Sequence, residues 1–155
     1  MDLILWRHAQ AHEASEGVED LARALTPRGE RDALRMGQWL DRRLARGARV
    51  LVSPALRCEQ TVLGLGREFQ CVPTLAPGAS VEDLLSQVGW PGASRPVVVV
   101  GHQPTLGQTL AHLLGMAQPS CPVRKGAVWW LRARVREGLL QASIVTVQSP
   151  EQLGD

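Results

Sequence analysis

Four consecutive valines, Val97–Val100, constrain the fold more than any other segment of this 155-residue chain. An uninterrupted β-branched run predicts a β-strand, and it shows no alternation between apolar and polar side chains. That pattern is typical of a strand buried on both faces, as in the centre of a parallel sheet. Gly101 and His102 follow the run directly. We therefore expect a histidine at the carboxyl end of a central strand.

Two shorter apolar runs predict further strands, and each ends in residues suited to binding an anion. The first, near the start of the chain, ends in Arg7 and His8. The second covers residues 50–52 and is followed by Ser53, with Arg57 one helical turn further on. In open α/β sheets, ligands bind just past the carboxyl ends of the strands. The arginines and histidines at these ends are therefore expected to meet at one edge of the sheet.

Helices are expected between these strands. A hydroxyl residue followed by proline is typical of a helix start, because the hydroxyl caps the helix and proline fits its first turn. The pattern occurs at Thr26-Pro27 and at Ser53-Pro54, and it predicts helices that run to about Gly47 and Phe69. Two further helices are expected to begin at Ser80, in a capping-box pattern with Asp83, and at Pro104.

The order of these elements predicts the fold class. Strands expected at 126–131 and 139–147 are close enough to form a terminal antiparallel hairpin. Strands alternating with helices before that hairpin predict one α/β domain of three layers with a mostly parallel central sheet. We expect this domain to span residues 1–148 and residues 149–155 to form a frayed C-terminal tail.

Composition excludes several functional classes. The formal net charge of +2 is too small to indicate binding to nucleic acid or a membrane surface. No stretch approaches the roughly 18 apolar residues of a membrane span. Cys58, Cys71 and Cys121 lack metal-ligand spacing, and no signal peptide is apparent. We therefore expect a cytoplasmic monomer without a metal or cofactor.

The strand-end residues together indicate a phosphate site. Arginine's rigid fork matches phosphate oxygens, and helix N-termini nearby would add backbone N–H groups. Each residue alone has a simpler explanation: Arg7-His8 as a salt-bridged surface pair, Arg57 as a solvated helix residue, and His102 as a packing residue. Recurrence of the pattern at three strand ends favours the functional interpretation. His12 and His112 show no such pattern, and we expect them outside the site.

The motifs resemble those of a known family. Arg7-His8 matches the first two residues of an Arg-His-Gly signature, residues 53–61 match a Ser-Pro-x-x-Arg-x-x-Gln-Thr segment, and Gly101-His102 matches a second histidine motif. On these residues the chain resembles the histidine phosphatase superfamily, whose fold is phosphoglycerate-mutase-like. Residues 25–29 and 100–104 make it most similar to the SixA group of phosphohistidine phosphatases.

The resemblance implies a division of roles. His8 would be the nucleophile and carry a transient phosphoryl group, while Arg7, Arg57 and His102 would hold the phosphoryl oxygens. Positioning and cationic stabilisation dominate phosphoryl transfer, so such a site requires no metal. Attack requires a neutral nitrogen, so the other ring nitrogen of His8 is expected to donate to an acceptor such as a backbone carbonyl. The roles of four polar neighbours stay open: Gln10, Ser53, Gln103 and Thr105.

The chain departs from the family pattern at two positions. Ala9 replaces the signature glycine, and Thr74 stands where many relatives carry a glutamate. Threonine cannot protonate a leaving group at neutral pH, and capping explains the nearby Glu82 and Asp83. An alkoxide leaving group gains a factor of about 10²–10⁴ from a general acid, whereas imidazole is far less basic. The missing acid therefore favours phosphohistidine over phosphate esters.

Three functions are consistent with these residues. We expect a phosphohistidine phosphatase, a hydrolase acting on a phosphoprotein of the phosphorelay or phosphocarrier type. The first alternative is a broad-specificity phosphomonoesterase in which Glu82, Asp83 or an acid from residues 13–20 supplies the proton. The second is a non-catalytic phosphoprotein-binding module. The intact set of arginines and histidines counts against the second, because a binding module has little need of a nucleophile.

Overall fold

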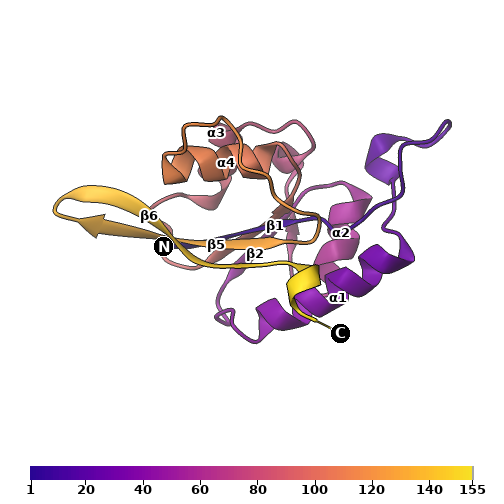
Figure 1. Cartoon of the computed structure of the whole chain (residues 1–155), viewed down its shortest axis with the longest axis horizontal. Coiled ribbons are helices and arrows are strands. Elements are labelled where there is room, and N and C mark those ends of the chain that lie inside the picture. The colour runs from indigo at the N-terminus through magenta and orange to yellow at the C-terminus, as the bar shows by residue number, and fades with distance from the viewer. Residues whose placement is uncertain (155) are drawn as a thin grey trace.

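A six-stranded sheet runs through the centre of the computed structural model, which describes residues 1–154 (Figure 1). The strand order is β3-β2-β4-β1-β5-β6, with β2, β3, β4 and β1 parallel and β5 antiparallel to both β1 and β6. This arrangement confirms the mostly parallel sheet and its terminal hairpin. The strands are β1 (Asp2–Arg7), β2 (Arg49–Val52), β3 (Gln70–Cys71), β4 (Val97–Gly101), β5 (Val128–Arg136) and β6 (Leu139–Gln148).

The central position of β4 explains its uniform valine sequence. β4 pairs in parallel with β1 on one side and β2 on the other. Val97 and Val99 pack into the core cluster on one face of the sheet, while Val98 and Val100 pack into the cluster on the opposite face. All four are buried. Both faces of the strand are therefore covered, as the sequence predicted.

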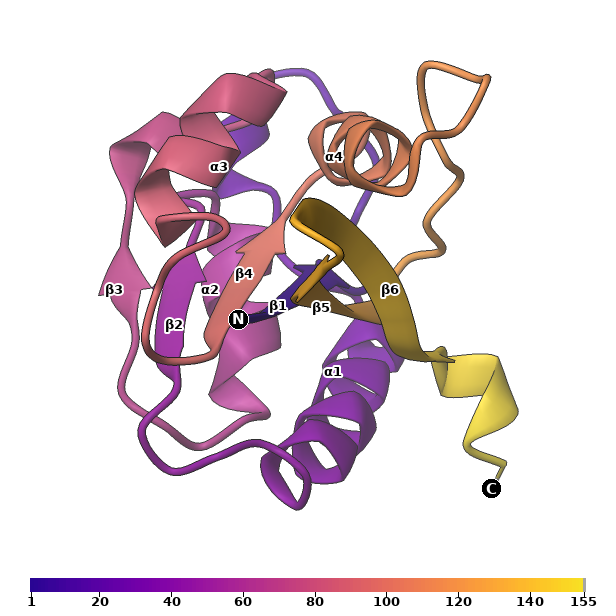
Figure 2. The same cartoon turned by 90° about the vertical axis from the view of Figure 1, so that its left-hand side faces the viewer.

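Helices cover the two faces of the sheet and complete the three layers (Figure 2). α1 and α2 pack with one core cluster, and α3 and α4 pack with the other. The helices are α1 (Pro27–Asp41), α2 (Leu56–Leu63), α3 (Val81–Val88) and α4 (Thr105–Leu114), with short 3-10 turns η1 (Asp20–Ala22), η2 (Pro73–Leu75) and η3 (Pro150–Gln152). None of the helices within residues 1–154 is long and apolar enough to cross a membrane.

Two of the predicted helix starts are confirmed by their hydrogen bonds. The Thr26 hydroxyl accepts from the backbone N–H of Gly29 at 3.0 Å. At α3, the Ser80 hydroxyl accepts from the Asp83 N–H at 3.0 Å, and the Asp83 carboxylate accepts from the Ser80 N–H at 3.2 Å. These contacts satisfy N–H groups that the first turn of a helix leaves without partners.

The first two helices end earlier than the sequence indicated. α1 ends at Asp41 rather than near Gly47, and α2 ends at Leu63 rather than Phe69. Gly64 follows α2 directly and lies against α1, where a Cβ would overlap the Ala33 carbonyl group. The prediction followed apolar spacing and missed this close approach. Residues 71–79, between α2 and α3, include the end of β3 and the η2 turn.

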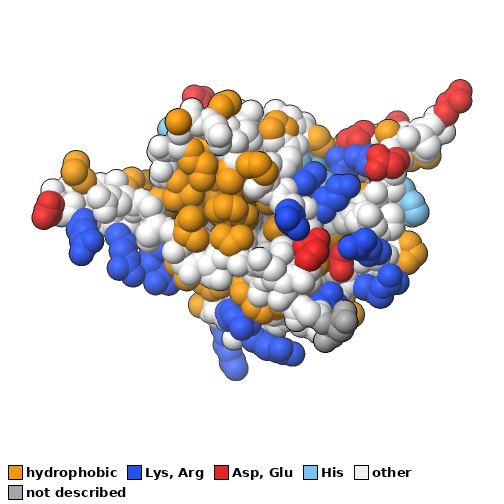
Figure 3. Space-filling model, viewed as in Figure 1, with side chains coloured by type: hydrophobic (Ala, Val, Ile, Leu, Met, Phe, Trp, Pro, Cys, Tyr) orange, Lys and Arg blue, Asp and Glu red, His pale blue; other side chains and the backbone are white. Residues whose placement is uncertain are grey.

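The C-terminal region differs from the expected frayed tail. Pro150–Gln152 form η3, in which Pro150 is buried and which contacts α1. The β5–β6 hairpin preceding it is longer than predicted and extends beyond the helices (Figure 1). Hydrophobic side chains gather where it leaves the body of the molecule (Figure 3). Its exposed apolar residues are Val135, Leu139, Leu140, Ile144, Val145 and Val147. The sequence analysis expected a monomer. That expectation stays a prediction, because the hairpin leaves this apolar surface exposed.

The contact between α1 and α2 yields a test of the packing. A Cβ at Gly37 would overlap the backbone of Gly64. Overpacking costs about 1–3 kcal/mol and more against rigid backbone, whereas alanine gains only about 1 kcal/mol over glycine in a helix. Gly37→Ala should therefore lower the free energy of unfolding by roughly 1–3 kcal/mol, measured by urea denaturation. Gly92→Ala is the control, because a Cβ at Gly92 meets no atom within 4 Å. Equal stability of the two variants would contradict this account.

Candidate active site

His8 lies directly after β1, at the edge of the sheet where β4 also ends. Its backbone N–H donates to the Gly101 carbonyl at 3.1 Å, and its carbonyl accepts from the Gly126 N–H at 3.0 Å. The next residue, Ala9, donates its N–H to the Thr61 hydroxyl on α2 at 3.0 Å. Backbone contacts to three other segments therefore hold His8 in place.

The His8 ring is held as a neutral imidazole. Its Nδ1 lies 2.8 Å from the Ala9 carbonyl oxygen. A carbonyl can only accept a hydrogen bond, so Nδ1 carries the proton and Nε2 keeps its lone pair. Burial lowers the pKa of His8, the Ala9 hydrogen bond opposes that effect, and the Arg57 and Arg7 cations add to it, so the pKa is about 4. His8 thus has the tautomer that the sequence analysis expected for attack.

Two arginines lie beside this histidine, each anchored through its terminal nitrogens. Arg7, at the end of β1, donates from Nη1 to the Val123 carbonyl at 2.7 Å. Arg57, in the first turn of α2, donates from Nη1 to the Asp20 carbonyl at 2.8 Å and from Nη2 to the Asp20 carboxylate at 3.1 Å. Both Nε–H groups are buried and have no partner.

His102 completes the group from the end of β4. Its ring centroid lies 5.3 Å from that of His8. Nε2 lies 2.7 Å from the Ser53 hydroxyl oxygen, whereas Nδ1 is buried and has no partner. Burial, together with the neighbouring His8 and Arg57, lowers the pKa of His102 to about 3. The side chain is therefore neutral at physiological pH.

The unpaired atoms indicate where a ligand binds. Within the described residues, Arg7 Nε, Arg57 Nε and His102 Nδ1 are the buried side-chain nitrogen or oxygen atoms without a hydrogen-bond partner. Buried polar groups are almost always paired, and an unpaired one costs about 1–3 kcal/mol. The three residues that carry these atoms line one cavity, which the fourth predicted residue, His8, also lines. The cavity therefore offers a bound anion several N–H donors.

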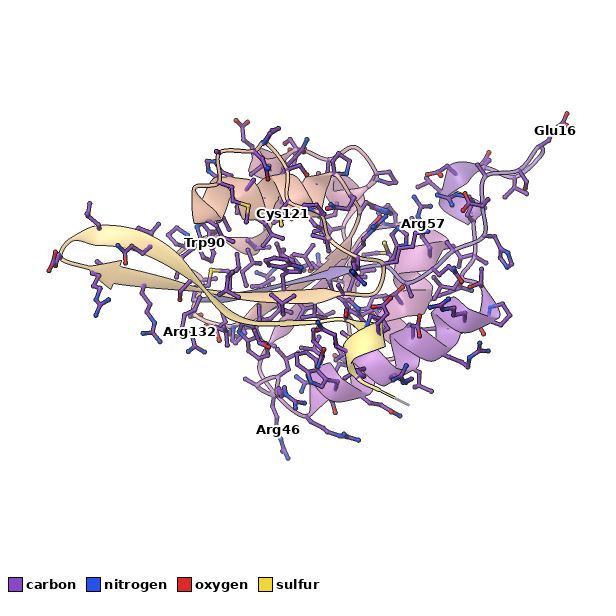
Figure 4. All side chains as sticks on the ribbon, viewed as in Figure 1. Glu16, Arg46, Arg57, Trp90, Cys121 and Arg132 are labelled. Carbon is purple, nitrogen blue, oxygen red and sulfur yellow. The ribbon has the colours of Figure 1, made fainter. Side chains whose placement is uncertain are left out.

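The cavity has a volume of about 250 Å³, and Arg7 and Arg57 give its lining a positive charge. Arg23 and Lys125 add to the positive charge, and Glu13 is the acidic residue of the lining. Figure 3 shows Lys and Arg side chains gathered on this part of the surface, with acidic side chains beside them. Figure 4 shows Arg57 between the sheet and the protruding segment that carries Glu16. The remaining lining residues are Ala11, Pro77 and Gln103.

The structure thus brings together all four predicted site residues and adds one that the sequence analysis did not identify. Asp20 was considered only among possible proton donors in residues 13–20, yet its carboxylate pairs with Arg57 and with Arg23. Burial raises the pKa of Asp20, but hydrogen bonds from the two arginines outweigh that effect and lower the pKa overall. Its position in the short 3-10 turn η1 left no periodic pattern by which to find it.

Other polar residues have structural contacts instead. Gln103 bonds the backbone of Cys121 and Gly107, and Thr105 bonds the Ala79 carbonyl. Gln10 accepts from the Thr26 hydroxyl. Thr74, Glu82, Asp83, His12 and His112 are not among the residues that line the cavity.

One helix-capping prediction is wrong. Ser53 was expected to cap the second helix, but α2 begins at Leu56 and its N-cap residue, Ala55, makes no side-chain cap. The Ser53 hydroxyl instead contacts His102, on the neighbouring strand end. The sequence pattern identified a hydroxyl beside a helix start but not the tertiary contact that competes for it.

Comparison with known proteins agrees with this geometry. A profile of the histidine phosphatase superfamily (branch 1) matches residues 3–80. The phosphohistidine phosphatase SixA homolog of Haemophilus influenzae is 30% identical over 135 residues, covering 77% of this chain and 80% of that protein. Phosphohistidine phosphatase SixA of Escherichia coli is 32% identical over 122 residues, covering 73% and 74%. The structure of the protein histidine phosphatase SixA complexed with tungstate aligns with a TM-score of 0.77 and 26% identity, covering 99% of both chains.

A phosphoglycerate-mutase-like α/β fold with cationic groups at its strand ends defines a class of phosphoryl-transfer hydrolase. The chain belongs to the histidine phosphatase superfamily, and its relatives include SixA phosphatases.

The depressed pKa of His8 predicts how stability depends on pH. Between pH 6.5 and about 4 the unfolded chain binds a proton at this position that the folded protein does not, so stability falls as pH falls through that range. Above pH 6.5 the effect disappears. Between pH 7 and pH 5, wild type should lose about 2 kcal/mol more unfolding free energy than His8→Gln, measured by urea denaturation. Equal losses would show that His8 is not buried in its neutral form.

Proposed function

We propose that the protein is a phosphohistidine phosphatase that acts on a phosphoprotein of the phosphorelay or phosphocarrier type. One observation carries this proposal. Three buried nitrogen atoms that can act as N–H donors have no partner, and they belong to residues around a neutral His8 whose Nε2 is free. A phosphoryl group has oxygens to accept from these donors and a phosphorus atom for the nucleophile to attack. The SixA relatives support the same substrate class.

The reaction proceeds in two transfers. His8 Nε2 forms a bond to phosphorus while the bond from phosphorus to the substrate imidazole nitrogen breaks, and the departing imidazole takes a proton from solvent. Water then attacks the phosphoryl group on His8, which releases inorganic phosphate and returns His8 to its neutral form. Arg7, Arg57 and His102 donate to the phosphoryl oxygens, where negative charge is spread in the transition state.

The acidic groups near the cavity favour a leaving group that needs little protonation. Asp20 is tied to Arg57 and Arg23, and its lowered pKa makes it a weak proton donor at neutral pH. Asp83 is used in the α3 capping box. Glu13 lines the cavity and is the specific observation that favours the alternative, a phosphomonoesterase. Imidazole leaves more readily than an alkoxide, so phosphohistidine remains the better fit.

Protein-borne phosphohistidine also fits the shape of the site. The segment 12–25 projects away from the sheet and its helices (Figure 1), and its residues Glu13 and Arg23 line one side of the cavity. A phosphorylated side chain presented by another protein can therefore approach.

We further propose a metal-independent monomer in the cytoplasm that binds neither membrane nor nucleic acid. The three cysteines, all free thiols, are consistent with that reducing compartment.

Matched peptides test the substrate class. Wild type should hydrolyse a phosphohistidine peptide at least about 100-fold faster than the corresponding phosphoserine peptide, measured by phosphate release. His8→Ala should lose at least about a thousandfold in kcat/KM, because it lacks the nucleophile. The control is His112→Ala, which changes an exposed histidine outside the cavity. Comparable turnover of the phosphoserine peptide, lost in Glu13→Gln, would identify a phosphomonoesterase. Phosphopeptide binding without turnover would identify a binding module.

The covalent intermediate provides a separate test. Rapid quenching during turnover of a phosphohistidine peptide should trap a phosphoryl group on His8, attached through nitrogen. Such an adduct is labile in acid and stable in alkali, and peptide mass spectrometry locates it. An adduct on serine, or none in an enzyme that turns over, would contradict the mechanism.

A further inference from the structure

Ser53 makes a contact that neither helix capping nor packing requires. It is fully buried at the end of β2, and its hydroxyl oxygen lies 2.7 Å from His102 Nε2. The same oxygen accepts from the Ala55 N–H at 3.2 Å. The Ala55 N–H can only donate, so the Ser53 hydroxyl hydrogen is free to point elsewhere. Cys58 lies nearby, with its sulfur 3.5 Å from the same ring nitrogen.

The two neutral forms of His102 differ sharply in how well they fit these neighbours. With the proton on Nε2, the Ser53 oxygen would accept from both His102 and Ala55, and its own hydrogen would have only the weakly accepting Cys58 sulfur nearby. Nδ1 would then present a lone pair to the cavity, where it would repel phosphoryl oxygens. With the proton on Nδ1, Ser53 donates to Nε2, and only the Nδ1–H remains unpaired, on a ring that lines the cavity.

We propose that Ser53 is a positioning residue that holds His102 in its Nδ1–H form, so that this N–H donates to the transferring phosphoryl group. The inference rests on the proposed function for the identity of the ligand, but the ring form itself follows from the contacts. Ala55 N–H to Ser53, Ser53 O–H to His102, and His102 N–H to the ligand form one directed chain.

This arrangement explains how two neutral histidines 5.3 Å apart take opposite roles. His8 is held through Nδ1 by a carbonyl, which turns its Nε2 lone pair toward the cavity. His102 is held through Nε2 by a hydroxyl, which turns its Nδ1–H toward the same cavity. Both rings carry their proton on Nδ1, yet one presents a nucleophile and the other a donor. The difference depends on which ring nitrogen the protein contacts, Nδ1 in His8 and Nε2 in His102.

Nitrogen NMR tests the ring form without requiring turnover. In ¹⁵N-labelled wild type at pH 7, the His102 signals, identified by their loss in His102→Gln, should show a protonated Nδ1 and an unprotonated Nε2. Adding inorganic phosphate should shift the Nδ1 signal. A protonated Nε2, with Nδ1 unprotonated, would overturn the proposal even in an active phosphatase. An inactive enzyme with the expected ring form would instead contradict only the proposed function.

A pair of variants tests the consequence for the reaction. Ser53→Ala removes the donor to Nε2, so His102 should populate both ring forms and kcat/KM for a phosphohistidine peptide should fall about 10-fold. Cys58→Ala is the control, because it also shortens a buried side chain next to Nε2 but leaves the Ser53 hydroxyl in place. It should retain the wild-type His102 signals. Equal losses of activity in the two variants, with unchanged His102 signals in both, would show that Ser53 serves only packing.

Discussion

Two backbone hydrogen bonds at the end of β4 hold the rest of the site in register. The His8 N–H donates to the Gly101 carbonyl, and the Ser53 N–H donates to the Val100 carbonyl, each at 3.1 Å. They continue the pairing of β4 with its two neighbours one residue beyond the strands. The residues that follow β1, β2 and β4 therefore lie side by side. Because β4 is buried on both faces, this register cannot slip without moving valines out of two cores.

The site is maintained at a cost in stability. It holds two arginines and two neutral histidines together and leaves three buried nitrogen atoms without partners. Burial and mutual repulsion depress the pKa values of His8 and His102 to about 4 and about 3. The same features make the site ready for a phosphoryl group, since donors already in place need no reorganisation when charge develops on its oxygens. The packed layers on either side of the sheet supply the stability that this arrangement requires.

Much of the fold was predictable because its signals are local. The valine run, the Thr26 cap and the Ser80 capping box each depend on residues close in sequence, and the structure confirms them. The close contact between α1 and α2 was not predictable, because it depends on Gly64 lying against the backbone of Ala33. Asp20 escaped notice for a similar reason, since its partner Arg57 is 37 residues away.

The sequence by itself determined which chemical groups stand at the strand ends, because strand boundaries and residue types are local properties. Arg7, His8, Arg57 and His102 could therefore be named together before their positions were known. Only the tertiary structure decided which ring nitrogen of each histidine is open to the cavity. That choice depends on the Ala9 carbonyl beside one ring and the Ser53 hydroxyl beside the other, and the Ser53 contact joins residues 49 positions apart. A hydrogen bond of that kind forms only once the parallel strands have aligned.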